Sequence, residues 1–262
     1  MLPAFFVAHG SPTLVVEQDA YTRFLAELGA ELKPRAVVIF SAHWLSGVQE
    51  ISAVPRYHTI HDFFGFPEEL YQIEYPAAGD PALAAEIGRL LSRHQVAHRL
   101  NRSRGLDHGA WVVLRLMYPD ATIPVVAMSV NPRLSPAEQY RIGQALAPLR
   151  RQNVLILASG GSVHNFKTMR WWDESQQGDR WAEAFDQWVS DRARAWDLEA
   201  LFAYRTRAPH ADLAVPLPGV EHFIPFFYAM GAADDQRVCR ERFRSYRYGN
   251  LSHTVWQFGE AA

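Results

Sequence analysis

The sequence predicts an α/β fold, with one domain over residues 1–262 and a mainly parallel central sheet flanked by helices. Short apolar or β-branched runs alternate with longer amphipathic segments, which is typical of βα units. The chain has 262 residues, of which 48% are hydrophobic and 21% charged, so it can bury one large core. No repeat, linker or low-complexity tract divides it into modules.

Six segments have the length and composition of strands. Five are short runs rich in Val, Ile, Leu, Phe and Ala, and the last alternates as a half-buried strand would. In chain order the expected strands are Ala4–Ala8, Ala36–Ser41, Val48–Val54, Ile123–Ser129, Val154–Ser159 and Ser252–Phe258. Alternation of these runs with helical segments favours parallel pairing.

Capping residues mark the expected helix starts. Asp80 precedes Pro81 as an N-cap precedes a proline in the first turn, and Ser135 to Glu138 reads as a capping box with the same proline arrangement. Further helices are expected at about Asp19 to Leu32 and Asp179 to Ala195, with shorter ones after Asp107 and Glu221. The apolar stretch Phe223–Ala233, interrupted by Pro225, is shorter than the ~20 residues of a membrane helix, so we expect a buried helix.

Charge and cysteine content narrow the partners and the compartment. The net charge is -2 and the arginines are scattered, so we expect no nucleic-acid partner. Cys239 is the single cysteine, cannot form an internal disulfide and is expected to be inert, which fits a reducing compartment. The amino-terminal residues lack the positive region of a signal peptide. We therefore expect a cytoplasmic protein that is not membrane-bound, as a monomer or homodimer.

Three histidines follow predicted strands. His9 and His43 come after the first two runs, and His164 comes after the Val154–Ser159 run and a Gly-Gly-Ser turn. Ligands of open α/β sheets bind beyond the carboxyl ends of the strands, so the three imidazoles are expected to converge there. Small residues such as Gly10 beside them permit close approach of the backbone to a ligand. The pattern predicts a site at the carboxyl ends of the strands.

His222 is a fourth candidate, at the entrance of the apolar segment that follows Glu221. A proline is tolerated in a first helical turn, so this segment can be a helix that begins near His222. The alternative is a histidine that merely caps the helix. The remaining histidines show no convergent spacing and are interpreted as surface or packing residues; they are His58, His94, His98, His210 and His253.

Motifs of several other enzyme classes are missing from the sequence. The segment from Gly160 to His164 lacks the final glycine of a G-x-S-x-G nucleophile elbow, which removes support for serine hydrolysis. No HExxH, Walker A or G-x-G-x-x-G pattern is present, so thermolysin-like proteolysis, P-loop NTP hydrolysis and Rossmann cofactor binding lack their signatures.

Taken together, the segments resemble the class III extradiol ring-cleavage dioxygenases, in the branch similar to DOPA extradiol dioxygenase, over nearly the whole chain. The combination and order of the motifs are specific, although each alone is weak. The motifs are His9-Gly10-Ser11-Pro12, Ser41-Ala42-His43-Trp44, His61-Asp62-Phe63 with Gly65-Phe66-Pro67, Tyr75-Pro76-Ala77, Asp107-His108-Gly109-Ala110-Trp111, Ser159-Gly160 with Val163-His164-Asn165, and Glu221-His222-Phe223 with Pro225.

The resemblance implies that His9, His43 and His222 bind the metal, with His164 beside it as the acid/base or a fourth ligand. The wider superfamily uses two histidines and one carboxylate, whereas the matching position here is His222, with Glu221 next to it. This departure leaves the third ligand and the native metal open.

The expected reaction is cleavage of a catechol ring by dioxygen at Fe(II), which keeps positions open for both reactants. A histidine titrates near neutral pH, so His164 is the expected proton-transfer group. His108, at a helix start after Asp107, is expected either to bond substrate or oxygen or simply to pack in its loop. His61 and Asp62 are expected to line the substrate pocket.

Two alternatives come from other functional classes. A histidine triad with an open position also suits Zn(II), so the chain can be a zinc hydrolase, and zinc can occupy the site even in a dioxygenase because it binds such ligands more tightly than Fe(II). The second alternative is a non-catalytic metal-binding protein of the same fold. The presence of His108 and His164 beside the ligand candidates argues against a mere scaffold.

Overall fold

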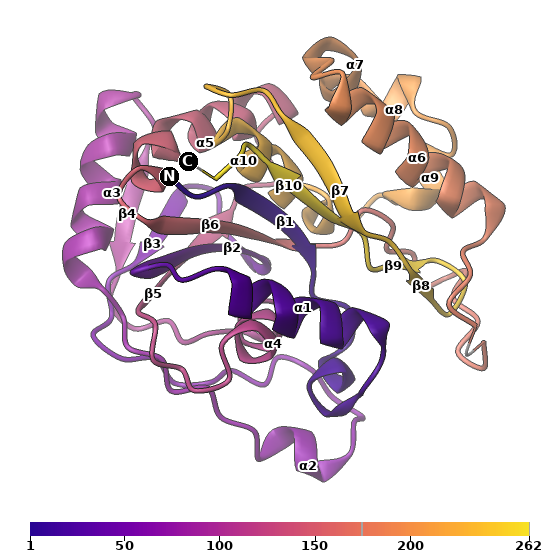
Figure 1. The fold of residues 1–262 in the computed structure, drawn as a ribbon, viewed down its shortest axis with the longest axis horizontal. Coiled ribbons are helices and arrows are strands. Elements are labelled where there is room, and N and C mark those ends of the chain that lie inside the picture. Colours follow the sequence, from indigo (N-terminus) through magenta and orange to yellow (C-terminus); the bar gives the residue numbers. More distant parts are fainter. Residues whose placement is uncertain (174, 262) are drawn as a thin grey trace.

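An eight-stranded sheet forms the centre of the molecule, with helices on both sides (Figure 1). The structure is a computed structural model that describes residues 1–173 and 175–261. The strand order is β4-β3-β5-β2-β6-β1-β10-β7, with a separate pair β8-β9. The strands are β1 (Ala4–Ala8), β2 (Ala36–Leu45), β3 (Gln49–Ser52), β4 (His98–Asn101), β5 (Val125–Val130), β6 (Val154–Gly160), β7 (Cys239–Phe243), β8 (Tyr246–Arg247), β9 (Leu251–Ser252) and β10 (Val255–Phe258).

The four central strands β5, β2, β6 and β1 run parallel, as do β3 and β4, so the predicted mainly parallel α/β sheet is confirmed. Antiparallel pairing is confined to the flanks, where β3 meets β5 and where β10 lies between β1 and β7. Because the four central strands share one direction, their carboxyl ends lie at a common edge. The register Ala8 opposite Gly160 places the ends of β1 and β6 side by side.

Capping residues begin the helices where the sequence predicts. The Asp80 carboxylate accepts the Leu83 amide at 2.9 Å, and Ser135 and Glu138 form a reciprocal capping box. The helices are α1 (Ala20–Glu31), α2 (Glu68–Tyr71), α3 (Pro81–Arg93), α4 (His108–Met117), α5 (Pro136–Arg150), α6 (Arg180–Arg194), α7 (Leu198–Phe202), α8 (Tyr204–Arg207), α9 (Ala211–Ala214) and α10 (Pro225–Gly231), with 3-10 turns η1 (Pro12–Val16) and η2 (Val220–His222).

Both faces of the sheet are buried, because successive strand side chains enter two different cores. Phe6 and Val38 belong to the core beneath α3, α5, α6 and α10, whereas their neighbours Phe5 and Val37 belong to the core beneath α1 and α4. Continuous apolar strands are the pattern expected of a sheet covered by helices on both faces. The sheet is therefore a fixed platform whose edge at the carboxyl ends stays open to a site.

Strand β2 is longer than predicted and includes His43. Pairing with β5 resumes at Leu45 opposite Val130 after an irregularity that begins beyond Phe40. His43 therefore lies within the strand rather than after it, so the prediction that each of the three histidines follows a strand is wrong for this one. The irregular pairing leaves the strand free to bend at the edge of the site.

His222 ends the 3-10 turn η2, and the helix α10 begins afterwards at Pro225. The buried apolar helix is confirmed, but His222 precedes it by a turn instead of opening it. The predicted strand Ser252–Phe258 is divided into the end of β9 and β10. The edge strands β4 and β7 are not predicted, because their sequences carry charged and polar side chains and half-exposed positions.

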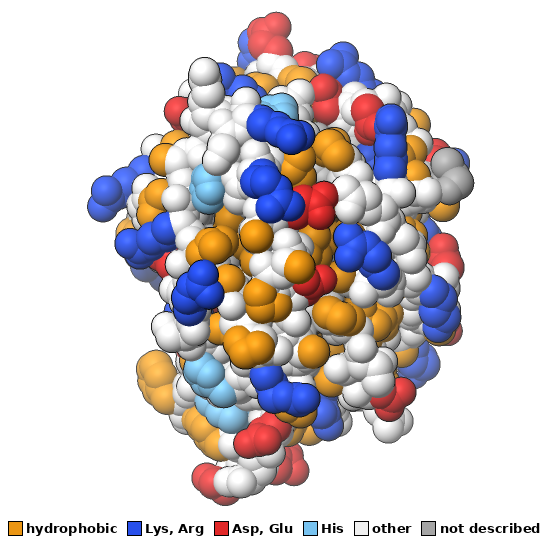
Figure 2. All heavy atoms as spheres, turned by 90° about the vertical axis from the view of Figure 1, so that its left-hand side faces the viewer, with side chains coloured by type: hydrophobic (Ala, Val, Ile, Leu, Met, Phe, Trp, Pro, Cys, Tyr) orange, Lys and Arg blue, Asp and Glu red, His pale blue; other side chains and the backbone are white. Residues whose placement is uncertain are grey.

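Surface properties agree with the composition. Figure 2 shows basic side chains interspersed with acidic and apolar ones on the face at the left of Figure 1, rather than gathered into one basic surface. Among the described residues, no helix combines the length and the apolar character required to cross a bilayer.

His253, between β9 and β10, is a packing residue with an unusual environment. Its ring stacks on Tyr21 with a centroid distance of 4.5 Å, and neither ring nitrogen has a hydrogen-bond partner among the described residues. Burial lowers the pKa of His253 to about 3. The fold therefore accepts only the neutral imidazole at this position.

Replacing His253 with Phe is expected to reduce the acid sensitivity of the fold. In the unfolded chain histidine has a pKa of ~6.5, so below that pH the unfolded state takes up a proton that the folded state excludes. At pH 5 this lowers the free energy of unfolding of the wild type by ~2 kcal/mol relative to pH 7.5. Urea denaturation at both pH values measures the difference. If wild type and His253→Phe lose equal stability between pH 7.5 and pH 5, the folded protein does not exclude the proton from His253.

Candidate metal centre

Histidines from three distant parts of the chain converge at the carboxyl edge of the sheet. His9 directly follows β1, His43 lies in β2 and His222 ends η2. The Nε2 atom of His43 lies 3.1 Å from Nε2 of His9 and 3.3 Å from Nε2 of His222. The structure thus brings together the three residues that the sequence resemblance assigns to the metal.

The opposite ring nitrogens face hydrogen-bond acceptors. His9 Nδ1 lies 3.1 Å from Ser159 Oγ, and the Ser159 hydroxyl donates to the carbonyl of Gly109, so its oxygen is left to accept from His9. His43 Nδ1 lies 3.2 Å from a carboxylate oxygen of Asp62. These contacts favour a proton on Nδ1 and an unprotonated Nε2 in both rings. An unprotonated Nε2 is the form of imidazole that binds a metal.

The spacing of the Nε2 atoms fits a cation between them. Two unprotonated nitrogens of His9 and His43 at 3.1 Å repel each other unless a positive charge lies between their lone pairs. Metal–imidazole bonds of ~2.1 Å place neighbouring ligand nitrogens about 3.0–3.4 Å apart in tetrahedral or octahedral geometry. The two distances between Nε2 atoms fall in this range, so the donor set fits a divalent transition metal.

Burial keeps His9 and His222 neutral. Desolvation lowers the pKa of His9 and of His222 well below the ordinary value, and the neighbouring imidazoles lower both further. His222 Nδ1 lies 3.4 Å from Glu221 Oε1 without a well-formed hydrogen bond. Glu221 therefore adjoins the outer side of the His222 ring and does not replace it in the cluster.

Asp62 joins two of the imidazoles. Its second carboxylate oxygen lies 2.9 Å from both Nδ1 and the main-chain nitrogen of His108. Burial alone would raise the pKa of Asp62, but the hydrogen bonds from His108 and His43 outweigh it and hold that pKa well below the usual value. Asp62 is therefore a partly exposed anion that orients His43 and His108.

His108 begins α4 after the N-cap Asp107, as predicted. Its ring centroid lies 4.0 Å from that of His43. The ligand atoms of His9, His43 and His108 all lie within 4.8 Å of one another, so a second three-histidine grouping exists. In the His9, His43 and His222 set, the two contacts of His43 are near the separation that metal ligation requires.

His164 lies against the cluster but with a different orientation. Its ring is parallel to that of His222, with centroids 3.7 Å apart and planes inclined by only 8°. Burial, followed by the charges of His222 and His43, lowers the pKa of His164 well below the ordinary value. The main-chain nitrogen of His164 donates to Ala214 at 3.1 Å, which holds this segment against α9.

The structure separates His61 from the cluster, although it is next to Asp62 in sequence. His61 Nε2 lies 2.9 Å from the carbonyl of Ile73, and its ring packs among Phe63, Tyr71 and Trp111. His61 thus borders the aromatic group behind His108 instead of facing His9 or His43.

Two residues of the site have a role that sequence reasoning missed. Ser159 orients His9, and the available signal was a hydroxyl at the end of an otherwise apolar strand. Gly160 permits the close approach of η2, because a Cβ there would lie 2.0 Å from the carbonyl of His222. The amide of Gly161 donates to that same carbonyl at 2.8 Å, which fixes His222 beside the end of β6.

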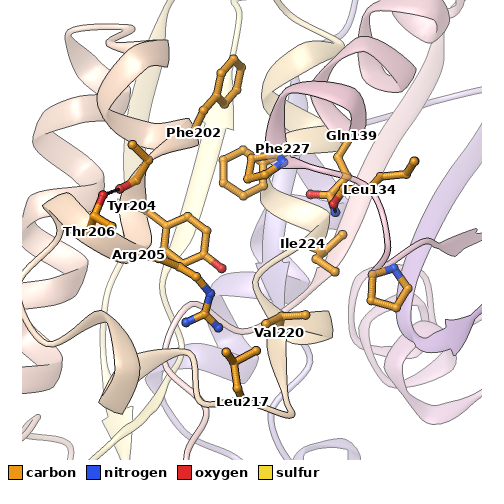
Figure 3. Close-up of a pocket in the computed structure, with 13 residues that line it drawn as sticks. Leu134, Gln139, Phe202, Tyr204, Arg205, Thr206, Leu217, Val220, Ile224 and Phe227 are labelled. Carbon is orange, nitrogen blue, oxygen red and sulfur yellow. Dashed lines mark hydrogen bonds between the residues drawn. The ribbon is translucent and has the colours of Figure 1, made fainter.

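A separate cleft of about 430 Å³ lies on another side of η2 (Figure 3). Val220 and Ile224, which flank His222 in sequence, contribute to its wall together with Tyr204 and Phe227. None of the clustered histidines lines it. The cleft is thus distinct from the histidine cluster, and the short η2 segment separates the two.

Comparison with known proteins identifies the family. The family described as the catalytic LigB subunit of aromatic ring-opening dioxygenase matches residues 3–256. The 4,5-DOPA dioxygenase extradiol of Beta vulgaris is 38% identical over 259 residues, which cover 97% of this chain and 95% of that protein. The protein of the same name from Escherichia coli K12 is 37% identical, with 98% and 95% covered.

A solved structure has the same fold. The crystal structure of an uncharacterized protein from Escherichia coli K12 aligns with a TM-score of 0.83 and 32% sequence identity, covering 99% of this chain and 100% of that one. The chain therefore belongs to the class III extradiol ring-cleavage dioxygenases, a family of oxidoreductases, in the branch similar to 4,5-DOPA dioxygenase extradiol.

Proposed function

We propose that this protein is an Fe(II)-dependent extradiol dioxygenase that opens the ring of a DOPA-like or related catechol, with both atoms of dioxygen entering the product. The observation that carries the proposal is the pair of Nε2 contacts from His43 to His9 and to His222, at 3.1 and 3.3 Å. Family membership supports the reaction class, and the relatives named 4,5-DOPA dioxygenase extradiol support the substrate class.

In this proposal His9, His43 and His222 hold the metal. When bound, Fe(II) supplies open coordination positions for a catechol and for dioxygen, together with the redox chemistry between them. The protein contributes the orientation of the ligands through Ser159 and Asp62, which fix two of the rings from behind.

We assign proton transfer to His164. A metal ion lies near the plane of each imidazole that binds it, and two nearly parallel rings with centroids 3.7 Å apart do not share such a point. This geometry argues that His164 is not a fourth ligand when His222 is the third. The lowered pKa leaves the His164 ring neutral at pH 7, so it can accept a proton from a catechol hydroxyl and return it during ring opening.

His108 is assigned a hydrogen-bonding role toward substrate or oxygen. Since Asp62 faces its Nδ1, the Nε2 side of the ring is left for a ligand, and the ring centroid lies 5.5 Å from that of His9. Asp62 then serves the pocket indirectly, by orienting His108 and His43. His61 is assigned to the aromatic wall next to Phe63, which supports the pocket from outside the cluster.

Loading the metal-free protein anaerobically with Fe(II) is expected to give oxygen uptake and a yellow ring-opened semialdehyde when DOPA or a related catechol and air are added. Loading with Zn(II) is expected to give neither, because zinc has no redox chemistry. The oxygen electrode and visible absorbance measure both. Inactivity of the iron form across a broad catechol panel would contradict the proposal, and zinc-dependent ester or amide hydrolysis would support the hydrolase alternative.

Replacing His43 or His222 with Ala is expected to lower metal affinity by at least ~10-fold, whereas His108→Ala retains the metal. Loss of a ligand removes a bond, while loss of an outer hydrogen-bonding group leaves the three nitrogens in place. The metal content of each variant after dialysis against a weak chelator, measured by mass spectrometry, ranks the variants by metal affinity. If His108→Ala loses metal and His222→Ala keeps it, the ligand set is instead His9, His43 and His108.

Replacing His164 with Ala is expected to lower turnover ~10²–10⁴-fold, the usual contribution of a general acid or base, with metal content close to that of wild type. His94→Ala is the matched control, because His94 is an exposed residue at the end of α3. Turnover of iron-loaded protein and metal content are measured on the same samples. Metal loss in His164→Ala would make His164 a ligand, and unchanged turnover would remove it from the reaction.

A further inference from the structure

A row of aromatic side chains extends outward from His164. The ring of Phe166 meets that of His164 edge-on at 4.6 Å, Trp171 stacks on Phe166 at 5.9 Å with planes 17° apart, and Tyr248 lies 5.0 Å from Trp171. We refer to Phe166, Trp171 and Tyr248 as the aromatic strip. Phe166 is 61% exposed and Trp171 57% exposed, so the strip faces solvent.

The strip lies on backbone that is firmly held. The amide of Arg170 donates to the carbonyl of Tyr248 at 3.0 Å, and the amide of Asp179 donates to the carbonyl of Gly249. The Arg170 guanidinium bonds the Asp179 carboxylate as well. These bonds tie the segment after β6 to the turn between β8 and β9, which lie side by side in Figure 1. The exposed rings therefore belong to a cross-linked pair of loops.

Tyr248 has a backbone φ of +54°, a left-handed conformation that is unfavourable for a large side chain. The Arg247 guanidinium lies 5.5 Å from the Tyr248 ring centroid, and it also pairs with the carboxylates of Glu17 and Asp19. Contacts with Trp171 and with the Arg247 guanidinium hold the Tyr248 ring at the outer end of the strip.

Contiguous exposed apolar surface is unfavourable in water and is typical of interaction sites, including ligand-binding grooves. The inner end of the strip touches His164, whose other ring contact is with His222 at 3.7 Å. The strip is thus continuous with the metal centre. A molecule that reacts beside His164 and extends toward solvent would meet these rings first.

We propose that the aromatic strip binds the part of a catechol substrate that projects away from its reacting hydroxyl-bearing carbons, and that it selects substrates with an aromatic or apolar substituent. The inference rests on the proposed function. Stacking is the recognition that three aromatic rings offer. The nearby Arg170 and Arg247 already pair with aspartate and glutamate side chains, so an acidic substituent gains little from them.

The chain provides a matched control in Trp172. It is adjacent to Trp171 and 79% exposed, yet it makes no ring contact with the other described aromatic residues. Removing Trp172 therefore removes the same chemistry from the same loop without touching the strip. The test compares Phe166→Ala and Trp171→Ala with Trp172→Ala and wild type.

The first measurement is the KM of the iron-loaded enzyme for 4-phenylcatechol and for unsubstituted catechol. Wild type and Trp172→Ala are expected to have a KM at least ~10-fold lower for 4-phenylcatechol, as one aromatic contact is worth about that factor. Phe166→Ala and Trp171→Ala are expected to lose most of this preference, taken as the ratio of the two KM values measured on the same variant. Unchanged preference in both variants would overturn the inference.

The second measurement needs no turnover. Zinc-loaded protein titrated with 4-phenylcatechol is expected to show quenching of tryptophan fluorescence that Trp171→Ala loses and Trp172→Ala retains. If no catechol is turned over while this quenching persists, the proposed reaction fails and the binding surface stands. If turnover occurs but Trp171→Ala quenches like wild type, the strip is not the binding surface.

Light scattering on the same variants tests the alternative that the strip binds a second copy of this chain instead of substrate. The inference expects the oligomeric state to be the same in wild type, Phe166→Ala and Trp171→Ala. A change of oligomeric state in the strip variants, together with an unchanged substrate preference, would identify the strip as a subunit interface and overturn the inference.

Discussion

The orientation of the His43 imidazole is the constraint on which the site depends. Its Nδ1 faces the Asp62 carboxylate at 3.2 Å, so its Nε2 is turned toward both His9 and His222. β2 lies between the parallel strands β5 and β6, and its regular pairing with them ends at Phe40 and Ser41, just before His43. The Asp62 carboxylate fixes the rotation of the His43 ring. The edge of the sheet and this carboxylate together determine where a cation can bind.

The same arrangement has a cost in the absence of a cation. Burying several imidazoles without water is tolerated only while they are neutral, and bringing the unprotonated nitrogens of His9 and His43 to 3.1 Å adds repulsion. A bound cation removes that repulsion, so part of its binding energy stabilises the fold. The charge of Asp62 is compensated by bonds from His43 and His108, and both bonds also orient rings of the site.

The core of the fold follows from local sequence, and its edges do not. Strands β1 and β6 are continuous apolar runs between helices, which only a sheet covered on both faces can bury. The edge strands β4 and β7 have charged, partly exposed sequences, and nothing local distinguishes them from loops. They become strands because the neighbouring strand has backbone N–H and C=O groups that are free to pair with them. That neighbouring strand comes from residues far away in the chain.

The sequence by itself determined which chemistry is present: imidazoles at the ends of apolar runs, small residues beside them and a capped helix that begins at His108. Only the tertiary structure decided how each ring is used. Ser159 orients His9 from 150 positions away, and the His164 ring stacks on that of His222. His61 and Asp62 are neighbours in sequence, but His61 contacts the carbonyl of Ile73 and Asp62 contacts His43. Hydrogen bonds and ring stacking between distant residues depend on the packing of whole strands, which local patterns do not specify.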